Sequence, residues 1–159
     1  MSELNETAEA VARRLIERGE SVAVGESAAG GLIAAALLGV AGASAYFKGG
    51  VVVYTSEGKV RLAGMTMEQI ARDRAATAPH TAILARLIRE KLDATWGVAE
   101  TGAAGPTGNR YGDAAGHAAL AVSGPVELTQ VIETGQTDRR ANMELFAVAA
   151  LRLLGEALG

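Results

Sequence analysis

Apolar positions in the first third of the chain recur with two spacings, which predict alternating helices and strands. Within Ala8–Ile16 they fall at i, i+3, i+4, i+7 and i+8, the spacing of an amphipathic helix, and Gly19 ends it. The next apolar run, residues 21–24, is typical of a strand buried on both faces. We expect a second helix to begin near Ala29 and a second strand at the β-branched run Val51–Tyr54.

The middle of the chain continues this alternation. Ser56 can cap a short helix that runs through Leu62. A longer helix is expected to begin near Pro79, a favoured first-turn residue, because one apolar stripe follows it. That stripe consists of Ile83, Leu84, Leu87, Ile88 and Leu92. Residues 96–100 then predict a third short strand.

The last third of the chain begins with a loop over residues 102–112. Two runs, Ala115–Ser123 and Val126–Thr134, are separated by Gly124-Pro125 and predict an antiparallel hairpin. A final amphipathic helix is expected from about Asp138. Strands that alternate with helices indicate a layered α/β domain, and the terminal hairpin makes its sheet mixed rather than wholly parallel.

Composition excludes several kinds of site. The 159 residues carry a formal charge of −3 and include two histidines and no cysteine. A disulfide framework or a cysteine-based zinc site is therefore impossible, and two histidines leave little for a metal cluster, so we expect no metal. The weak negative charge argues against nucleic-acid binding, which needs a clustered positive field.

Two stretches bear on location. Residues 1–7 are polar and acidic and lack the basic start and apolar core of a secretory signal, so we expect a cytoplasmic protein. Residues 30–47 carry no charge and approach the length of a membrane span. Gly39 and Gly42 would interrupt such a helix, and a buried helix followed by a turn fits better than contact with a membrane. The same stretch is compatible with a homo-oligomer or with a monomer core.

Unusual residues follow the carboxyl ends of the first three predicted strands. They are Glu26-Ser27 with Gly30-Gly31, then Tyr54 to Lys59, and then Thr101-Gly102 with a glycine-rich loop. In open α/β sheets, loops at the carboxyl ends of strands converge on one ligand-binding crevice. We therefore expect these three segments to meet in one site.

Ser27, Tyr54 and Lys59 together carry a chemistry that none of them carries alone. A serine hydroxyl becomes a good nucleophile only when a base takes its proton, and a lysine can be that base if burial lowers its pKa. Ser–Lys pairs are a known substitute for Ser-His-Asp. In the alternative interpretation Ser27 caps the next helix, Lys59 is solvated and Tyr54 completes a strand. His80 and His117 stand in no motif.

Backbone amides and guanidiniums could bind an anion at the same edge. Gly30-Gly31 would let the backbone approach a ligand at the start of the helix after Ser27. Residues 101–108 could cradle a phosphate with successive amides, although they match neither the P-loop nor the dinucleotide fingerprint. Arg139-Arg140, just after Asp138, could also hold a phosphate, or could be solvated at a helix start.

Five motifs in this order resemble the CinA C-terminal domain family over roughly residues 4–158. They are Gly25 to Ile33, Gly42 to Phe47, Gly49 to Tyr54 with Lys59, Thr101 to Pro106, and Asp138-Arg139. The resemblance implies a three-layer α/β/α sandwich with a mixed, mostly parallel sheet, and we expect residues 1–159 to form one such domain. Larger members of the family carry an additional N-terminal domain that this sequence does not contain.

The resemblance also implies an activity. Active members of the family are nicotinamide-nucleotide amidases, which hydrolyse the carboxamide of nicotinamide mononucleotide to nicotinic acid mononucleotide and ammonia. It implies Ser27 as nucleophile, Lys59 and Tyr54 as the proton-handling pair, and no cofactor. It implies a substrate-binding role for a further group of residues, with Arg139 at the phosphate. That group is Glu26, Gly30, Gly31, Ser44, Thr101, Gly102, Gly105 and Arg139.

Three positions depart from the family pattern. Ala29 replaces a threonine, Asp113 stands where a lysine is usual, and Met143 replaces a second arginine. Asp113 near a phosphate would repel it, and Arg110 could compensate for the missing lysine. Two alternatives to the amidase therefore stay open. One is a nucleotide-binding or regulatory module without turnover, and the other is an interaction protein without a small-molecule site.

Overall fold

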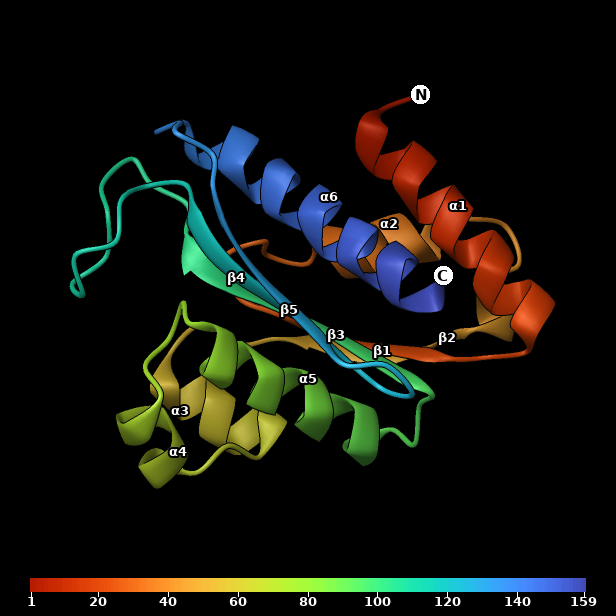
Figure 1. Cartoon of the computed structure of the whole chain (residues 1–159), viewed down its shortest axis with the longest axis horizontal. Helices are drawn as coiled ribbons and strands as arrows, with labels where there is room; N and C mark the ends of the chain where they lie inside the picture. The colour runs from red at the N-terminus through yellow and green to blue at the C-terminus, as the bar shows by residue number, and fades with distance from the viewer.

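The computed structural model describes all 159 residues, which form three layers (Figure 1). The middle layer is one sheet of five strands. The strands are β1 (Val22–Glu26), β2 (Phe47–Val52), β3 (Trp96–Ala103), β4 (His117–Ser123) and β5 (Leu128–Glu133). The helices α1 (Glu3–Arg18), α2 (Leu32–Leu38) and α6 (Arg139–Leu158) cover one face. The helices α3 (Ser56–Gly58), α4 (Met67–Arg72) and α5 (Ala78–Lys91) lie on the other, so the predicted three-layer sandwich is confirmed.

The sheet is mixed, as predicted, and its strand order is β2-β1-β3-β4-β5. Strand β1 pairs in parallel with β2 and with β3, whereas β4 pairs antiparallel with both β3 and β5. Four strands therefore run in one direction and β4 alone runs against them. The carboxyl ends of β1, β2 and β3 meet at one edge of the sheet, where a ligand site is expected in such folds.

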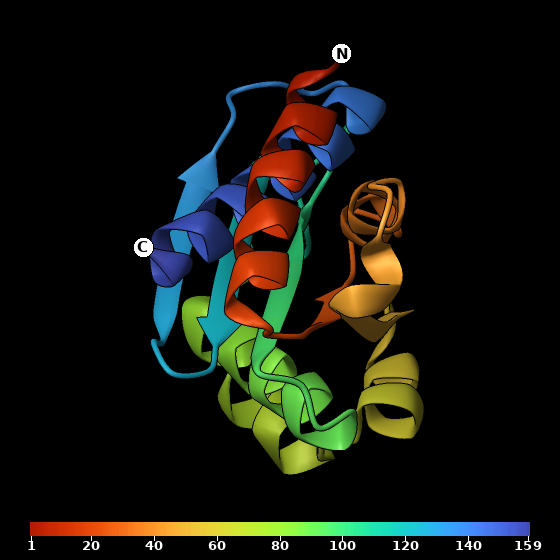
Figure 2. The same ribbon diagram turned by 90° about the vertical axis from the view of Figure 1, so that its right-hand side faces the viewer.

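The core is split unequally between the two faces of the sheet. The larger cluster has 27 buried residues and lies between the sheet and α1, α2 and α6. Its largest side chains include Trp96, Phe146 and Leu151, none of which is exposed. The two clusters on the α5 face have seven and three residues. Figure 2 shows α1 lying over the sheet beside α6.

The second strand begins and ends earlier in the chain than predicted. Pairing with β1 begins at Phe47 and ends at Val52, whereas the β-branched run had indicated Val51–Tyr54. Gly50 lies so close to β1 that a Cβ would stand 2.8 Å from the carbonyl oxygen of Val24, so glycine is required inside this strand. Pairing with β1 sets the start of this strand, whereas the strand propensity of the residues alone placed that start too late in the chain.

The second helix begins at Leu32 and not near Ala29. Gly30 and Gly31 both have left-handed backbones, with φ of 68° and 102°, and they form a turn before the helix. The N-cap residue of α2 is Gly31, which has no side chain to cap the helix. Ser27 is therefore not the helix cap that the alternative interpretation expected.

Other element boundaries differ in smaller ways. The short helix after β2 is capped by Thr55 rather than by Ser56, and it continues as a π-helical turn over Lys59–Ala63. Helix α4 was missing from the prediction, although Thr66 and Gln69 form a capping box that signals its start. The predicted hairpin and the final helix after Asp138 are confirmed. No helix combines the length and the apolar character needed to cross a membrane.

Candidate active site

Segments that follow β1, β2 and β3 meet around one cavity of about 480 Å³, as the sequence predicts. Ser27 comes from the turn after β1, and Tyr54 and Lys59 come from the segment after β2. Thr101 and Gly102 of β3 complete the inner wall, and the loop residues 109–111 form the outer wall. All three predicted catalytic residues therefore line the same cavity.

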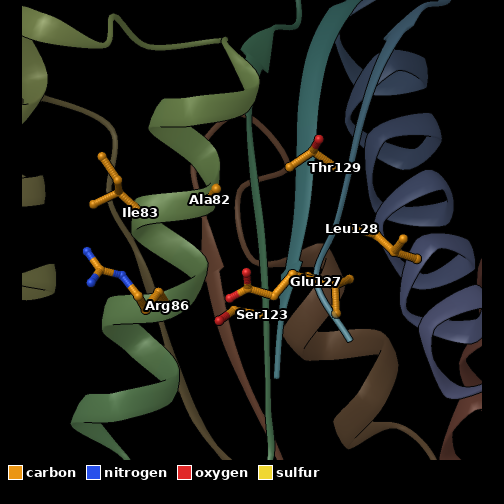
Figure 3. A pocket seen from close by; sticks show the side chains of 8 residues that line it. Ala82, Ile83, Arg86, Ser123, Glu127, Leu128 and Thr129 are labelled. Atoms are coloured by element: carbon orange, nitrogen blue, oxygen red, sulfur yellow. The ribbon is translucent and has the colours of Figure 1, made fainter. Parts of the chain in front are cut away.

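A second cavity of about 360 Å³ lies between α5 and the β4–β5 hairpin (Figure 3). Its polar side chains include Arg86, Ser123 and Glu127. None of the predicted site residues lines it. The Ser27 cavity is therefore the candidate active site.

Ser27 is almost buried, with 7% of its surface exposed, and its side chain reaches the cavity. Its backbone amide donates a hydrogen bond of 3.2 Å to Oε2 of Glu100, and the amide of Ala29 donates one of 2.8 Å to the same oxygen. Glu100 lies on the neighbouring strand β3. One buried carboxylate oxygen thus holds both ends of the Ser27–Ala29 turn.

A second buried carboxylate, that of Glu26, takes three amides that follow this turn, at the start of α2. Glu26 is 1% exposed and accepts hydrogen bonds of 2.9 to 3.1 Å from the amides of Gly31, Ile33 and Ala34. Glu26 therefore caps the start of α2, and it does not line the cavity. The sequence had suggested that the Ser27 turn supplies amide donors for a ligand anion, but the two glutamates occupy those donors.

Lys59 is 3% exposed although it carries an amine. It begins the π-helical turn, and its side chain lines the cavity beside Ser27. Burial lowers the pKa of Lys59, and the charge of Glu100 opposes that effect. A lysine with a lowered pKa holds a larger fraction of the neutral amine that proton abstraction from a serine requires than an exposed lysine does.

Tyr54, Arg139 and Gly105 meet at the rim of the cavity. Tyr54 is 62% exposed, and its hydroxyl lies 3.4 Å from Nη2 of Arg139. Nη1 of Arg139 donates a hydrogen bond of 2.5 Å to the carbonyl of Gly105. The guanidinium is thereby held at the mouth of the site, where the charge of a ligand phosphate could meet it.

Thr101 and Gly102 lie inside β3 rather than after it, because the strand runs on to Ala103. The hydroxyl of Thr101 accepts a hydrogen bond from the amide of Ala76 and shares another, of 2.7 Å, with the hydroxyl of Thr81. It therefore ties β3 to the start of α5. A Cβ on Gly102 would stand 2.7 Å from the carbonyl oxygen of His117, so only glycine fits there.

Of the predicted binding group, Thr101 and Gly102 line the cavity and Gly105 and Arg139 lie at its rim, whereas Glu26 and three further residues, Gly30, Gly31 and Ser44, lie outside it. Gly30 packs against Met143, whose methyl group would stand 2.7 Å from a Cβ at Gly30, and Gly31 is the cap of α2. Ser44 lies in a 3-10 turn, Ala43–Ala45, just before β2. Because β1 and β2 are parallel, the start of β2 is at the opposite edge of the sheet from Ser27. The structure does not bring Ser44 to this site.

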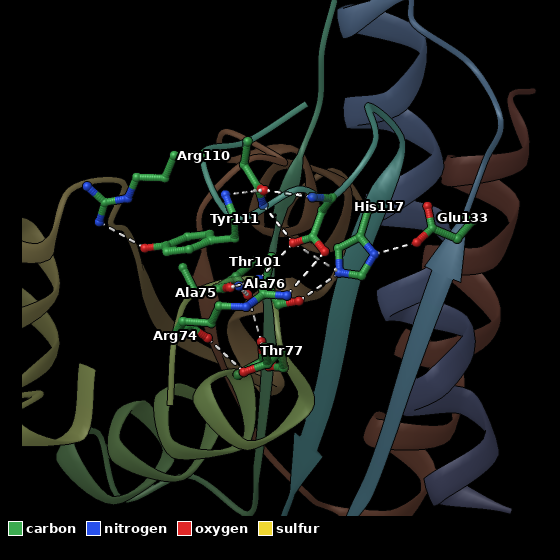
Figure 4. Close-up of polar contacts among 12 residues, drawn as sticks. Arg74, Ala75, Ala76, Thr77, Thr101, Arg110, Tyr111, His117 and Glu133 are labelled. Atoms are coloured by element: carbon green, nitrogen blue, oxygen red, sulfur yellow. Dashed lines mark hydrogen bonds and ion pairs between the residues drawn. The ribbon is translucent and has the colours of Figure 1, made fainter. Parts of the chain in front are cut away.

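Sequence reasoning missed a polar network that supports the outer wall (Figure 4). Arg74 binds Asp113 with two hydrogen bonds of 2.7 and 3.2 Å, and Asn109 donates a third. The guanidinium of Arg74 also lies 4.9 Å from the centre of the Tyr111 ring. Asp113 is therefore paired and does not line the cavity, which removes the expected repulsion of a phosphate. Arg110 lines the cavity and hydrogen-bonds the Tyr111 hydroxyl.

His117 joins the same network to the hairpin. Its Nδ1 lies 2.5 Å from a carboxylate oxygen of Glu133, and its Nε2 lies 2.8 Å from the carbonyl of Ala76. Both partners only accept, so the ring must donate from both nitrogens and carry a proton on each. Burial opposes that charge, but the bonds to Glu133 and Ala76 and the charge of Asp113 outweigh it and raise the pKa of His117.

Comparison with known proteins identifies the family of this chain. The model of the CinA C-terminal domain matches residues 4–158. The chain belongs to the CinA C-terminal domain family. A CinA-like protein of Anaeromyxobacter sp. (strain K) is 40% identical over 154 residues, which are 97% of this chain and 38% of that protein. One from Acidobacterium capsulatum is 39% identical over 99% of the chain. The chain thus spans about 38% of the length of these relatives.

Solved structures of the family show the same fold. A CinA superfamily protein from Klebsiella pneumoniae superposes with a TM-score of 0.92 at 30% identity, covering 98% of this chain and 97% of the other. A competence/damage-inducible protein from Agrobacterium tumefaciens gives a TM-score of 0.93 at 27% identity, covering 100% of this chain and 98% of the other. These CinA proteins share the layered α/β architecture over essentially their whole lengths.

Proposed function

We propose that this CinA domain is an amidohydrolase that converts nicotinamide mononucleotide to nicotinic acid mononucleotide and ammonia. The observation that carries the proposal is the buried amine of Lys59, which lines one cavity with the hydroxyls of Ser27 and Tyr54. Lysine is seldom buried in proteins, because burial removes the hydration of its charged amine and so costs free energy. Its burial at the same cavity as a serine that has no helix-capping role favours catalysis over packing.

In the proposed reaction, the Ser27 oxygen attacks the carboxamide carbon and its proton passes to the amine of Lys59. The carbon–nitrogen bond then breaks, and the nitrogen leaves as ammonia after taking a proton from Lys59, with Tyr54 beside the path. Water hydrolyses the resulting ester, releases the carboxylate product and restores the Ser27 hydroxyl. Every proton in this sequence is held by the chain itself or by water.

The charges at the cavity mouth support a phosphorylated substrate. Arg139 lies at the rim beside Tyr54, and Arg110 lines the outer wall. The carboxylate of Asp113, which could oppose an anion, is neutralised by Arg74. Guanidiniums bind phosphate with two parallel hydrogen bonds, so either arginine suits the phosphate of a mononucleotide.

One observation favours a second candidate, a nucleotide-binding module without turnover. The amides of Ser27, Ala29 and Gly31 are bound to Glu100 and Glu26, so they do not form an oxyanion hole. Loss of a single oxyanion donor costs an acyl-transfer enzyme about 100-fold to 1000-fold in rate. An active enzyme would have to stabilise the oxyanion with side chains such as Tyr54 or the protonated Lys59.

Ammonia release from nicotinamide mononucleotide separates the two candidates. We expect turnover by the wild type and a loss of at least about a thousand-fold in Ser27→Ala and in Lys59→Ala. Ser123→Ala is the matched control, because Ser123 is a buried serine that contacts Arg89 at the second cavity, and it should keep the wild-type rate. Thermal stabilisation by the mononucleotide without ammonia would support the binding module instead. Near-normal turnover by Ser27→Ala would remove Ser27 from the mechanism.

A further inference from the structure

Two buried side-chain atoms in the whole molecule have no hydrogen-bond partner, and both belong to groups that interact electrostatically with Lys59. They are Oε1 of Glu100 and Nε2 of His80. Native proteins leave few buried polar atoms unpaired, because each one loses its hydration without compensation. Two such atoms, on two groups that interact with the same buried amine, indicate a role that packing does not explain.

His80 is held in one orientation. Its Nδ1 lies 2.8 Å from the carbonyl of Asp73, which can only accept, so Nδ1 carries the proton and Nε2 has a free lone pair. Burial lowers the pKa of His80, and the charge of Lys59 lowers it further. The ring therefore stays neutral and leaves Nε2 as an unpaired acceptor on a group that the charge of Lys59 acts on.

Glu100 acts on both partners of the proposed reaction. Its Oε2 accepts the amides of Ser27 and Ala29, which fixes the turn that carries the Ser27 hydroxyl. Its charge acts on Lys59, where it opposes the effect of burial. Burial, partly offset by the amides of Ala29 and Ser27, raises the pKa of Glu100 to about 7, so the carboxyl changes charge within the physiological range.

We propose that Glu100 is a positioning residue for the Ser27–Lys59 pair: one carboxylate oxygen fixes the serine turn, and the carboxylate charge controls whether Lys59 holds its proton. As far as it concerns catalysis, this inference rests on the proposed function. The coupling between Glu100 and Lys59 can be measured without any substrate. Glu100 would be a positioning residue and not a catalytic one, because it does not line the cavity.

The sign of the effect follows from the charges. A carboxylate near Lys59 stabilises the ammonium form, so removal of that charge must make Lys59 lose its proton at a lower pH. Other titratable or cationic groups also surround Lys59 and stay in place when Glu100 is changed. They are His80 of α5, Tyr54 after β2, and Arg110 and Tyr111 of the outer wall.

Glu100→Gln tests the proposal with little disturbance of the fold. The glutamine oxygen can accept the amides of Ser27 and Ala29, and its NH₂ group takes the place of the unpaired Oε1. The chain contains three lysines, so the ¹³Cε signals of lysine-labelled protein can each be followed across a pH titration. We expect the midpoint of Lys59 to fall by about half a unit or more in Glu100→Gln, with Lys48 and Lys91 unmoved.

Glu26→Gln is the matched control. Glu26 lies on the neighbouring strand β1, and its buried carboxylate accepts three amides at the start of α2. The substitution neutralises this carboxylate, whose charge does not act on Lys59. Its Lys59 midpoint should equal that of the wild type. An unmoved midpoint in Glu100→Gln, or an equal shift in both variants, would overturn the proposal.

A reciprocal measurement covers the case in which Glu100→Gln does not fold. Coupling between two sites acts equally in both directions, so Lys59→Met must raise the midpoint of the Glu100 carboxyl above that of the wild type. The ¹³Cδ signal of Glu100 reports that midpoint, and an unchanged value would also overturn the proposal. Since neither titration needs turnover, absence of ammonia release would refute the amidase while leaving this coupling measurable.

Discussion

The two faces of the sheet are built differently. The face under α1, α2 and α6 holds a cluster of 27 buried residues, whereas the α5 face holds clusters of seven and three. Both sides contain buried polar side chains, and those of the larger side include Asn142 of α6 and Glu26 at the start of α2. On the smaller side the buried polar side chains lie at or near the cavity, and they are Lys59, His80, Thr81 and Thr101. The large apolar face therefore provides most of the stability, and this stability permits polar groups that are costly to bury around the cavity.

The largest effect that would test this comparison comes from Phe146, which is fully buried in the larger cluster. We expect Phe146→Ala to lower the free energy of unfolding by about 3–5 kcal/mol, because it removes apolar contacts and leaves a cavity. Urea unfolding gives that value, and the ¹³Cε titration of Lys59 in the same variant should be unchanged. Val131→Ala, at a side chain 50% exposed on β5, should stay within about 0.5 kcal/mol of the wild type. A loss below about 1 kcal/mol in Phe146→Ala would contradict this division of roles.

A smaller effect of opposite sign is expected at Lys59. Burial holds the pKa of Lys59 below its ordinary value of 10.5, so the charged side chain destabilises the fold at neutral pH. Lys59→Met should therefore raise the free energy of unfolding by about 1–2 kcal/mol while it abolishes turnover. The gain should shrink as the pH rises toward 10.5, where the unfolded chain also loses this proton.

Unfolding curves at several pH values check the Lys59 prediction. Lys48→Met is the control, because Lys48 is exposed and its replacement should change stability by less than about 0.5 kcal/mol. A Lys59→Met protein that is less stable than the wild type at neutral pH would show that the buried amine contributes to packing.

The smallest effect concerns His117, which ties the hairpin to the outer wall. Its pKa is raised in the folded protein, so its favourable contribution is complete below its ordinary value of 6.5 and is lost as the pH rises through the folded value. We expect His117→Ala to lose about 1 kcal/mol more stability at about pH 5 than at about pH 9. Paired thermal or urea unfolding curves give this difference, and a loss that does not vary with pH would show that the ring contributes only by packing.

Much of the architecture could be predicted from local patterns. The 3.6-residue spacing of apolar positions in α1 and α6 and the hairpin around Gly124 indicated the helices and strands correctly. The position of Ser27 and Lys59 after buried strands placed both at one edge of the sheet, which the cavity confirms. The start of β2 was misplaced, because Gly49 and Gly50 have low strand propensity and pair only through their contact with β1.

No local sequence pattern could show which groups pair with the buried charges. Glu100 is separated by 73 residues from Ser27, whose amide it accepts, and Arg74 by 39 residues from Asp113. The sequence suggested that Glu26 contacts a ligand and that Ser44 belongs to the site, but the first caps α2 and the second lies at the other edge of the sheet.

Local sequence patterns predicted the order of the strands and of every helix except α4, the mixed sheet, and the serine, tyrosine and lysine of the candidate site. These features depend on periodicity and on the position of a residue relative to its own strand. Which amides are bonded, which charges are paired and how deeply Lys59 is buried depend on contacts between distant parts of the folded chain. The physical reason is that hydrogen bonding and desolvation depend on neighbours in space, which the fold brings together from distant parts of the chain.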